Sequence, residues 1–194
     1  MIRFCDVFFS LLGLIVLSPI FVIIALCIVL DSRGGVFYRQ VRVGRDGKDF
    51  RLFKFRSMAS GADKKGLITV GAKDSRVTRV GYFLRKYKLD ELPQLLNVVR
   101  GEMSLVGPRP EVRKYVDMYT VEQRKVLAVA PGITDYASIE YADENTILGQ
   151  ARDPDRAYVQ IMPDKIRYNM KYINNRCLKE YFKIIFLTLM KIVK

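Results

Sequence analysis

Two adjacent carboxylates, Asp90 and Glu91, are the side chains of this sequence best suited to catalysis. The chain has 194 residues, no histidine and three scattered cysteines, which excludes Ser-His-Asp and Cys-His mechanisms and the zinc sites that need a histidine. Catalysis must then use carboxylates, lysines, arginines, hydroxyls or a hard metal ion. An Asp is ionised at neutral pH, since its reference pKa is about 3.9, so it can attack phosphorus without a general base. The alternative is that the pair only caps a helix, because anions are stabilised at helix N-termini.

Positive charge is the second feature of the sequence. Lys and Arg number 33 against 20 Asp and Glu, which gives a net charge of +13. Such a surplus predicts a phosphate-rich partner: nucleic acid, an anionic membrane face or a nucleotide substrate. A carboxylate that attacks an anionic diphosphate needs this repulsion neutralised, by Mg²⁺ and by Arg or Lys. Lys54, Arg85 and Arg109 lie in segments that can supply that charge.

Arg109 lies in a stiff Gly-Pro-Arg-Pro segment, residues 107–110. The two prolines restrict the backbone on both sides of the arginine and so lower the entropy cost of ordering its guanidinium against a phosphate or a base edge. A structural turn whose arginine faces water is an equally good interpretation of this segment by itself.

A β-hairpin and several helices are expected to position these residues. Strands are predicted over residues 36–43 and 49–58 and helices over 78–88 and about 90–100, with Gly101 as the stop. Residues 60–73, rich in glycine and lysine, predict a loop. Further along, we expect a helix over 111–130, a long connection over 143–164 and an amphipathic helix over 165–194. That last helix suits either an anionic membrane interface or a soluble core, and the apolar N-terminus favours the interface.

Residues 7–30 form an apolar segment of 24 residues without a charge. A helix of that length reaches roughly 36 Å, enough to cross the hydrocarbon core of about 30 Å. The segment is too long for a secretory signal, which predicts that it remains in the mature protein. Ser18 and Pro19 fall at its midpoint, where proline bends a helix, so a kinked spanning helix and a re-entrant hairpin both fit. The residues by themselves slightly favour the spanning helix, since serine hydroxyls and local adjustments can satisfy the freed carbonyls. The basic residues that follow place the rest of the chain in the cytoplasm in either case.

Five motifs, taken together and in order, resemble those of the small monotopic phosphoglycosyl transferases, a family of bacterial sugar transferases. These motifs are Phe-Phe-Ser-Leu-Leu-Gly-Leu-Ile-Val-Leu-Ser-Pro at residues 8–19, Lys-Phe-Arg-Ser-Met at 54–58, Lys-Leu-Asp-Glu-Leu-Pro-Gln-Leu-Leu-Asn-Val at 88–98, Met-Ser-Leu-Val-Gly-Pro-Arg-Pro at 103–110 and Pro-Gly-Ile-Thr at 131–134.

The resemblance implies transfer of a phospho-sugar from a UDP-sugar to polyprenol (undecaprenyl) phosphate, with release of UMP, through a covalent aspartyl intermediate. By match to the motifs, Asp90 is the nucleophile, and Glu91 is the Mg²⁺ ligand beside it. Lys54 and Arg85 match positions that handle phosphate, and Arg109 belongs to the motif near the nucleotide. Asp90, as its neighbour, is the second candidate metal ligand.

The resemblance also implies an α+β fold: a mostly helical small domain with a short β-hairpin, a re-entrant membrane helix and amphipathic interfacial helices. The helix break is expected at Ser18 and Pro19, in a membrane-embedded part over residues 1–32. Residues 33–194 are then the catalytic domain at the cytoplasmic face of the bacterial inner membrane, in contact with anionic lipids.

One departure from the family concerns the sugar. After Pro-Gly-Ile-Thr, some members continue with Gly-x-Ala-Gln-Val-Asn-Gly-Arg, whereas this chain has Asp-Tyr-Ala-Ser-Ile-Glu-Tyr-Ala at residues 135–142. No arginine occupies the matching place, so the identity of the sugar does not follow from those members.

A second hypothesis from another class is a membrane-tethered basic protein that binds nucleic acid or anionic lipid without catalysis. The sequence has no helix-turn-helix, zinc finger or aromatic RNA-binding motif, so no nucleic-acid partner is expected.

Overall fold

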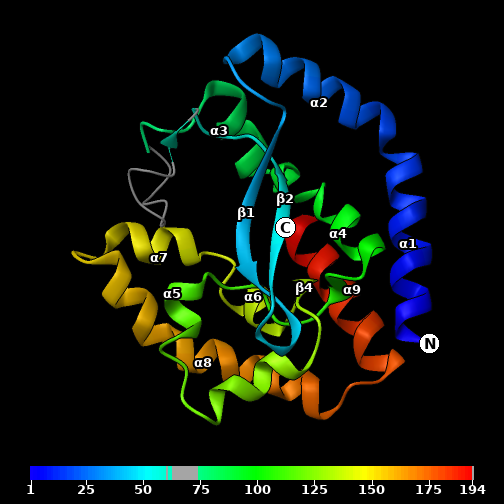
Figure 1. Ribbon diagram of the computed structural model, residues 1–194, viewed down its shortest axis with the longest axis vertical. Helices are drawn as coiled ribbons and strands as arrows, with labels where there is room; N and C mark the ends of the chain where they lie inside the picture. The colour runs from blue at the N-terminus through cyan, green and yellow to red at the C-terminus, as the bar shows by residue number, and fades with distance from the viewer. Residues whose placement is uncertain (60, 63–73, 194) are drawn as a thin grey trace.

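The computed structural model describes residues 1–59, 61–62 and 74–193, so nearly all of the loop predicted over residues 60–73 lies outside the described residues. The described part is mostly helical and contains two small two-stranded sheets, which agrees with the predicted α+β class (Figure 1). Its longer elements are α1 (Ile2–Val16), α2 (Ser18–Asp31), β1 (Phe37–Val43), β2 (Asp49–Phe55), α3 (Arg79–Lys86), α4 (Gln94–Arg100), α8 (Pro154–Asn174) and α9 (Leu178–Val193).

The N-terminal segment is a pair of helices that meet at Leu17 at an angle of 61°. Pro19 has no N–H for the carbonyl of Ile15, and the Ser18 hydroxyl donates to this carbonyl instead, over 2.8 Å. The break therefore falls where Ser18 and Pro19 predicted it. None of the described helices is by itself long and apolar enough to cross a bilayer, although the bent pair has that length and composition when its two helices are taken together.

The predicted hairpin is confirmed. β1 and β2 pair antiparallel, with Phe37 opposite Phe55 and Val43 opposite Asp49. The turn is the short 3₁₀ segment η1 (Arg45–Gly47), in which Asp46 and Gly47 have φ values of 57° and 73°. Asp and Gly tolerate this left-handed conformation better than other residues, which explains the sharp reversal at this point.

The region around the two carboxylates differs in detail from the single helix expected from residue 90. The helix predicted over residues 78–88 is α3, which Thr78 caps by accepting from the Gly81 amide. The carboxylates then lie in a separate 3₁₀ turn, η3 (Leu89–Glu91), and α4 begins only after Pro93. Lys88 has a φ of 56°, which turns the chain between α3 and η3. Gly101, with a φ of 89°, ends α4 as predicted.

The helix predicted over residues 111–130 is wrong. Only α5 (Arg113–Val116) and the 3₁₀ segment η4 (Gln123–Ala128) are helical there. The Glu111 carbonyl accepts from the Val43 amide over 2.8 Å, which ties this part of the chain to β1. Thr120 and Gln123 then bond each other's backbone amides, and this reciprocal cap starts a new turn.

The connection predicted over residues 143–164 and the single helix over 165–194 are also wrong. Two helices occupy the first range, α7 (Glu144–Gln150) and the beginning of α8. Asp153 caps α8 by accepting from the Arg156 amide, and Pro154 occupies the first turn, where proline is tolerated. The second range is broken at Asn175, whose side chain donates to the Lys171 carbonyl near the end of α8.

A short parallel pair joins the middle of the chain, β3 (Ser104–Val106) beside β4 (Gly132–Thr134), and α6 (Tyr136–Glu140) follows directly. Gly132 and Gly107 approach each other closely beside this pair. A Cβ on Gly132 would lie 2.1 Å from the Gly107 nitrogen. This close approach fixes the start of the Gly-Pro-Arg-Pro segment.

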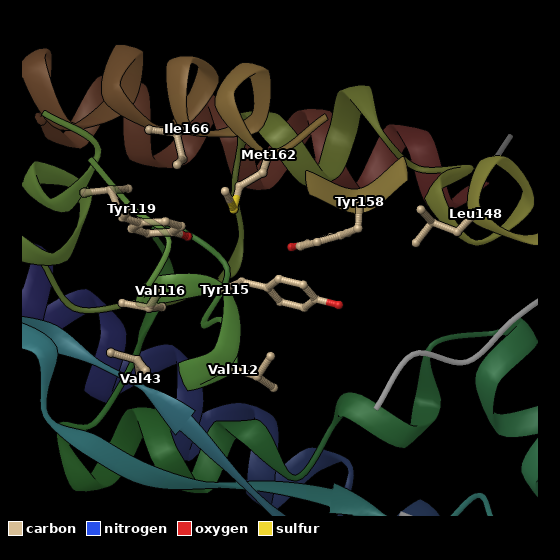
Figure 2. Packing of buried hydrophobic residues seen from close by; sticks show 10 residues of the cluster. Val43, Val112, Tyr115, Val116, Tyr119, Leu148, Tyr158, Met162 and Ile166 are labelled. Atoms are coloured by element: carbon tan, nitrogen blue, oxygen red, sulfur yellow. The ribbon is translucent and has the colours of Figure 1, made fainter. Parts of the chain in front are cut away.

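The largest hydrophobic cluster packs α8 against α5, η4 and the end of β1 (Figure 2). The rings of Tyr115 and Tyr158 meet in it with centroids 4.6 Å apart. A smaller cluster of Ile24, Ile28, Phe55 and Leu84 places α2 against β2 and α3. The bent N-terminal pair is thus packed on the rest of the molecule, and α1 runs along its side next to α4 (Figure 1).

Arg56 anchors the end of α2. Its buried guanidinium donates to the carbonyls of Gly35, Arg33 and Ser32 over 2.6, 2.8 and 2.7 Å. These are carbonyls of the segment that follows α2, where the regular helical pattern of hydrogen bonds has ended.

Replacing Arg56 by lysine should lower the free energy of unfolding by about 2 kcal/mol, because an ammonium cannot reach all three carbonyls and leaves buried acceptors unpaired. Thermal unfolding in detergent, followed by circular dichroism, measures the change. Arg51→Lys on the exposed side of the same strand is the matched control and should leave the midpoint unchanged. Equal midpoints for the two variants would contradict the anchoring role.

Candidate active site

Glu91 is the centre of the candidate site, because two cations from other segments converge on it. The Lys54 ammonium, from β2, donates to Oε1 over 3.0 Å. The Arg109 guanidinium donates to both oxygens, over 2.6 Å to Oε1 and 3.3 Å to Oε2. Three of the residues predicted from the sequence are therefore in direct contact, although they come from distant parts of the chain.

The charge state of Glu91 is set by these partners. Burial alone would raise the pKa of this carboxyl, but the nearby charges of Arg109 and Lys54 outweigh burial and hold the pKa well below its usual range. Glu91 in turn raises the pKa of Arg109, whereas burial lowers the pKa of Lys54 in spite of the carboxylate beside it. Glu91 is thus a firmly ionised group at neutral pH.

Asp90, its neighbour in the chain, has a different environment. Its residue surface is only 8% exposed, and burial raises the pKa of its carboxyl, opposed chiefly by the positive charge of Lys54. The part of the chain that the structure describes provides no hydrogen bond to this carboxylate. Asp90 also lines a cavity beside this turn, so its oxygens are available to a ligand there.

A buried asparagine, Asn97, attaches the helix that follows the two carboxylates to β2. The Asn97 side chain, on α4, accepts from the Phe53 amide over 2.9 Å and donates to the Arg51 carbonyl over 2.9 Å. Because these two groups lie on the edge of β2 that does not pair with β1, Asn97 attaches α4 to the strand that carries Lys54. Its amide also donates to Glu102, just beyond α4.

Arg109 is held by its backbone as well as by its prolines. The Asp135 carboxylate accepts from the Arg109 amide over 2.9 Å with one oxygen and from the Ser138 amide with the other. Asp135 is 1% exposed, and burial raises the pKa of its carboxyl in spite of the amides of Ser138 and Arg109. The backbone of this segment is thus fixed, and Arg109 lines the cavity with its guanidinium paired to Glu91 rather than facing only water. Its role toward a ligand stays a prediction.

The cavity beside Asp90 has a volume of about 460 Å³, in the range of small-molecule sites. Arg85, on the last turn of α3, lines it together with Lys54, Asp90 and Arg109. The charge of Arg85 opposes the rise that burial causes in the pKa of Asp90. Within the described residues, Arg85 makes no direct ion pair with either carboxylate. Ser18 and Pro19 do not line this cavity; they lie at the junction of α1 and α2.

The opposite wall of the cavity contains polar residues that the sequence did not single out. Lys165, on α8, donates to Glu144 over 2.8 Å and to the Tyr158 hydroxyl over 3.2 Å. That hydroxyl donates to Glu111, whose other oxygen lies 3.9 Å from Arg42. Glu111 directly follows the Gly-Pro-Arg-Pro segment and could have been suspected on that ground, whereas α7 and α8 were not expected to be near it.

The residues present fit a Mg²⁺ ion of the kind that is held by few protein ligands. The described residues contain no cluster of three or more candidate metal ligands, so a closed protein cage is absent from that part of the chain. Mg²⁺ commonly takes one or two carboxylates and completes its shell with water and substrate phosphate oxygens. Among the described residues, the Asp90 carboxylate accepts no hydrogen bond and Oε2 of Glu91 has only the longer contact to Arg109, so both carboxylates can contribute.

Comparison with known proteins gives a match to the family described as bacterial sugar transferase, over residues 1–194. An Aeromonas hydrophila protein named UDP-N-acetylgalactosamine-undecaprenyl-phosphate N-acetylgalactosaminephosphotransferase is 37% identical over 194 residues, covering 98% of this chain and 43% of the relative. The UDP-glucose:undecaprenyl-phosphate glucose-1-phosphate transferase of Klebsiella pneumoniae is 40% identical over 192 residues, covering 97% of this chain and 39% of the relative.

A third relative is closer in length. The exopolysaccharide production protein ExoY of Sinorhizobium fredii is 39% identical over 147 residues, which cover 68% of this chain and 65% of the relative. The chain spans less than half the length of the first two relatives.

Asp135 gives a prediction that separates it from an ordinary helix cap. Asn normally replaces Asp well at an N-cap, but here both carboxylate oxygens accept from amides, and one of them would face an amide N–H₂ group. Asp135→Asn should therefore cost about 1–2 kcal/mol of stability, as should Asp135→Ala. The matched control is Asp153→Asn at the cap of α8, where one amide donates and no loss is expected. Chemical unfolding measures all three, and a neutral Asp135→Asn would contradict the double-acceptor role.

Proposed function

The chain belongs to the bacterial sugar transferase family, and we propose that it transfers a phospho-sugar from a UDP-sugar to polyprenol phosphate and releases UMP. The observation that carries this proposal is the juxtaposition of Asp90, a buried carboxylate that accepts no hydrogen bond from the described residues, with three cations that line one cavity: Lys54, Arg85 and Arg109. Relatives whose names state that they act on undecaprenyl phosphate with UDP-sugars support the same reaction class.

In the proposed first step, an oxygen of Asp90 attacks the phosphorus that bears the sugar. The bond from this phosphorus to the bridging oxygen breaks, and UMP leaves with that oxygen. The product is a covalent aspartyl phospho-sugar. Lys54, Arg85 and Arg109 neutralise the diphosphate, which removes the repulsion that would otherwise keep a carboxylate away from it.

In the proposed second step, a phosphate oxygen of polyprenol phosphate attacks the same phosphorus. The bond to Asp90 breaks, the carboxylate is regenerated, and polyprenol diphosphate sugar is the product. No proton has to be moved to the nucleophile in either step, which suits a chain without histidine.

Glu91 has a different part in this proposal from its neighbour. Its oxygens hold Lys54 and Arg109 in place beside Asp90. With Asp90 it would also hold Mg²⁺, which supplies further positive charge against the diphosphate when bound.

We propose that residues 1–32 enter the membrane from the cytoplasmic face of the bacterial inner membrane and return to it. The 61° bend at Leu17 and the packing of both helices on the rest of the molecule support a re-entrant arrangement. Exposed apolar side chains on α1 and α9, among them Phe8, Phe9 and Phe186, would lie in the bilayer, and basic residues near them would contact anionic lipids. Residues 33–194 would form the catalytic domain at this face.

The chain has no arginine at the place where some family members have one after Pro-Gly-Ile-Thr, so the sugar is not assigned from those members. The relatives' names include both N-acetylgalactosamine and glucose. The segment from Asp135 onward forms α6, and its place in the fold is set by the cap of Asp135.

Asp90→Asn should abolish UMP release, because an amide is not a nucleophile toward phosphorus. The assay follows UMP from a panel of UDP-sugars with undecaprenyl phosphate and Mg²⁺, and EDTA should stop it. Mass spectrometry of the wild-type chain with UDP-sugar but no acceptor should show a phospho-sugar adduct on the peptide that contains Asp90. Lys125→Gln, at an exposed residue, is the control with full turnover.

Undiminished turnover of Asp90→Asn would disprove the nucleophile, and no UMP from any sugar would disprove the proposed reaction. Nucleic-acid binding with a steep salt dependence, unchanged in Asp90→Asn, would instead indicate the binding protein of the second hypothesis.

The topology has its own test. In a chain whose three cysteines are replaced by serine, a cysteine added before Met1 should react with a membrane-impermeant maleimide only after the inner membrane is opened. A cysteine at Lys125 reports the catalytic domain and should behave in the same way. Labelling of the N-terminal cysteine in intact spheroplasts would show that the segment spans the membrane.

A further inference from the structure

We propose that Arg3 and Asp6 are positioning residues for the Glu91–Arg109 pair, so that α1 acts as a strut between the two elements that carry this pair. Only the kinetic test of this inference rests on the proposed function; the hydrogen-exchange test does not. Arg3 and Asp6 are the two charged residues of α1, and both make their contacts with the catalytic part of the chain.

Asp6 reaches the strand that leads to Arg109. The Ser104 hydroxyl lies 2.9 Å from each oxygen of its carboxylate, and the Leu105 amide donates to Oδ1 over 2.9 Å. The Tyr181 hydroxyl, from α9, donates to the same oxygen over 2.9 Å. A carboxylate that is 2% exposed is costly unless such donors satisfy it, so the contact holds α1 in one place against β3. β3 continues directly into residues 107–110.

Arg3 reaches the helix that follows Glu91. Its guanidinium donates to the carbonyls of Val98 and Val99 over 2.6 and 3.0 Å. These carbonyls belong to the last turn of α4, where a cation is favourable because the helix dipole is negative there. α4 begins shortly after Glu91, so a shift of this helix moves the carboxylate.

The other end of α1 also touches α4. A Cβ on Gly13 would lie 3.2 Å from Leu95 Cδ1, which shows that the two helices approach closely near the start of α4. α1 therefore runs antiparallel to α4 along its length (Figure 1). The other side of α1 faces outward, with Phe4 74% and Ile15 71% exposed.

These contacts make the geometry of the active site depend on the N-terminal helix. Glu91 moves with α4 and Arg109 follows β3, and α1 is bonded to both elements. Loss of the Asp6 contacts would leave Glu91 and Arg109 in the chain, but their relative positions could then shift. A misplacement of about 1 Å in an active site can lower a rate by about 10²-fold.

The test compares Asp6→Asn and Arg3→Gln with the wild-type full chain in lipid nanodiscs. We expect kcat for UMP release to fall about 10- to 100-fold, while KM for the UDP-sugar changes less than about threefold, because the cavity residues remain. Hydrogen exchange should rise in residues 94–110 and stay unchanged in the hairpin, residues 37–55. Asp6→Asn and Ser104→Ala should be strongly non-additive in kcat, since they break the same contact.

Tyr141→Phe is the matched control. It removes a tyrosine hydrogen bond of 2.7 Å, to Asp164, that involves no residue of α1, α4 or β3, and should leave kcat and the exchange of residues 94–110 unchanged. If Asp6→Asn does not fold, Tyr181→Phe removes one of its donors and is measured in the same way.

The inference would be overturned if Asp6→Asn and Arg3→Gln both keep the wild-type kcat and hydrogen exchange. A uniform rise of hydrogen exchange over the whole chain would also overturn it. If the wild-type chain releases no UMP, the proposed function fails, and the local exchange measurement still decides whether α1 positions α4 and β3.

Discussion

A single half-buried carboxylate, Glu91, imposes the constraint on which the rest of this structure depends. Taking three charges out of water is unfavourable unless each is paired at short range, and removal of one partner would leave the others uncompensated. Glu91 therefore has to meet Lys54 and Arg109 together. Those cations come from a β-strand and from a proline-bounded loop, so the fold must bring three separate segments to one point and hold them there.

The segments are joined by single polar side chains rather than by a large sheet. Asn97 attaches α4 to β2, Asp135 fixes the backbone at Arg109, and Arg56 closes the end of α2. Each of these side chains is buried and satisfies several backbone groups at once. Such joints stabilise one arrangement, because any displacement leaves buried donors and acceptors unpaired. The hydrophobic clusters then fill the space between segments whose relative positions are already defined.

Much of this arrangement could be predicted from the sequence where the signal was local. The hairpin, the cap of α3, the break at Ser18 and the stop at Gly101 follow from residue types at short spacing. The helix expected over residues 111–130 failed because its apolar periodicity competed with bonds to β1 and with a new cap at Thr120. The start of α8 has an Asp-Pro pair that is typical of a helix N-terminus. The range was nevertheless predicted as a connection, because it contains two prolines.

The site was predictable as a set of residues and not as a geometry. The motifs indicated Lys54, Glu91 and Arg109, but their mutual contact depends on pairings across the chain that periodicity does not encode. The wall formed by Glu111, Tyr158 and Lys165 was missed because α8 was not expected there. Asp6 was visible as a charge beside an apolar run, yet its partners in β3 and α9 lie far away in sequence.

The contact between Asn97 and the edge of β2 has a consequence for how the molecule behaves among its own copies. A two-stranded ribbon has unpaired amides and carbonyls along both outer edges, and such an edge can recruit a strand from another chain. On β2 the side-chain amide of Asn97 occupies the groups of Phe53 and Arg51 that a foreign strand would need. The same residue that attaches α4 to the strand of Lys54 thus also protects this part of the edge from pairing with another chain.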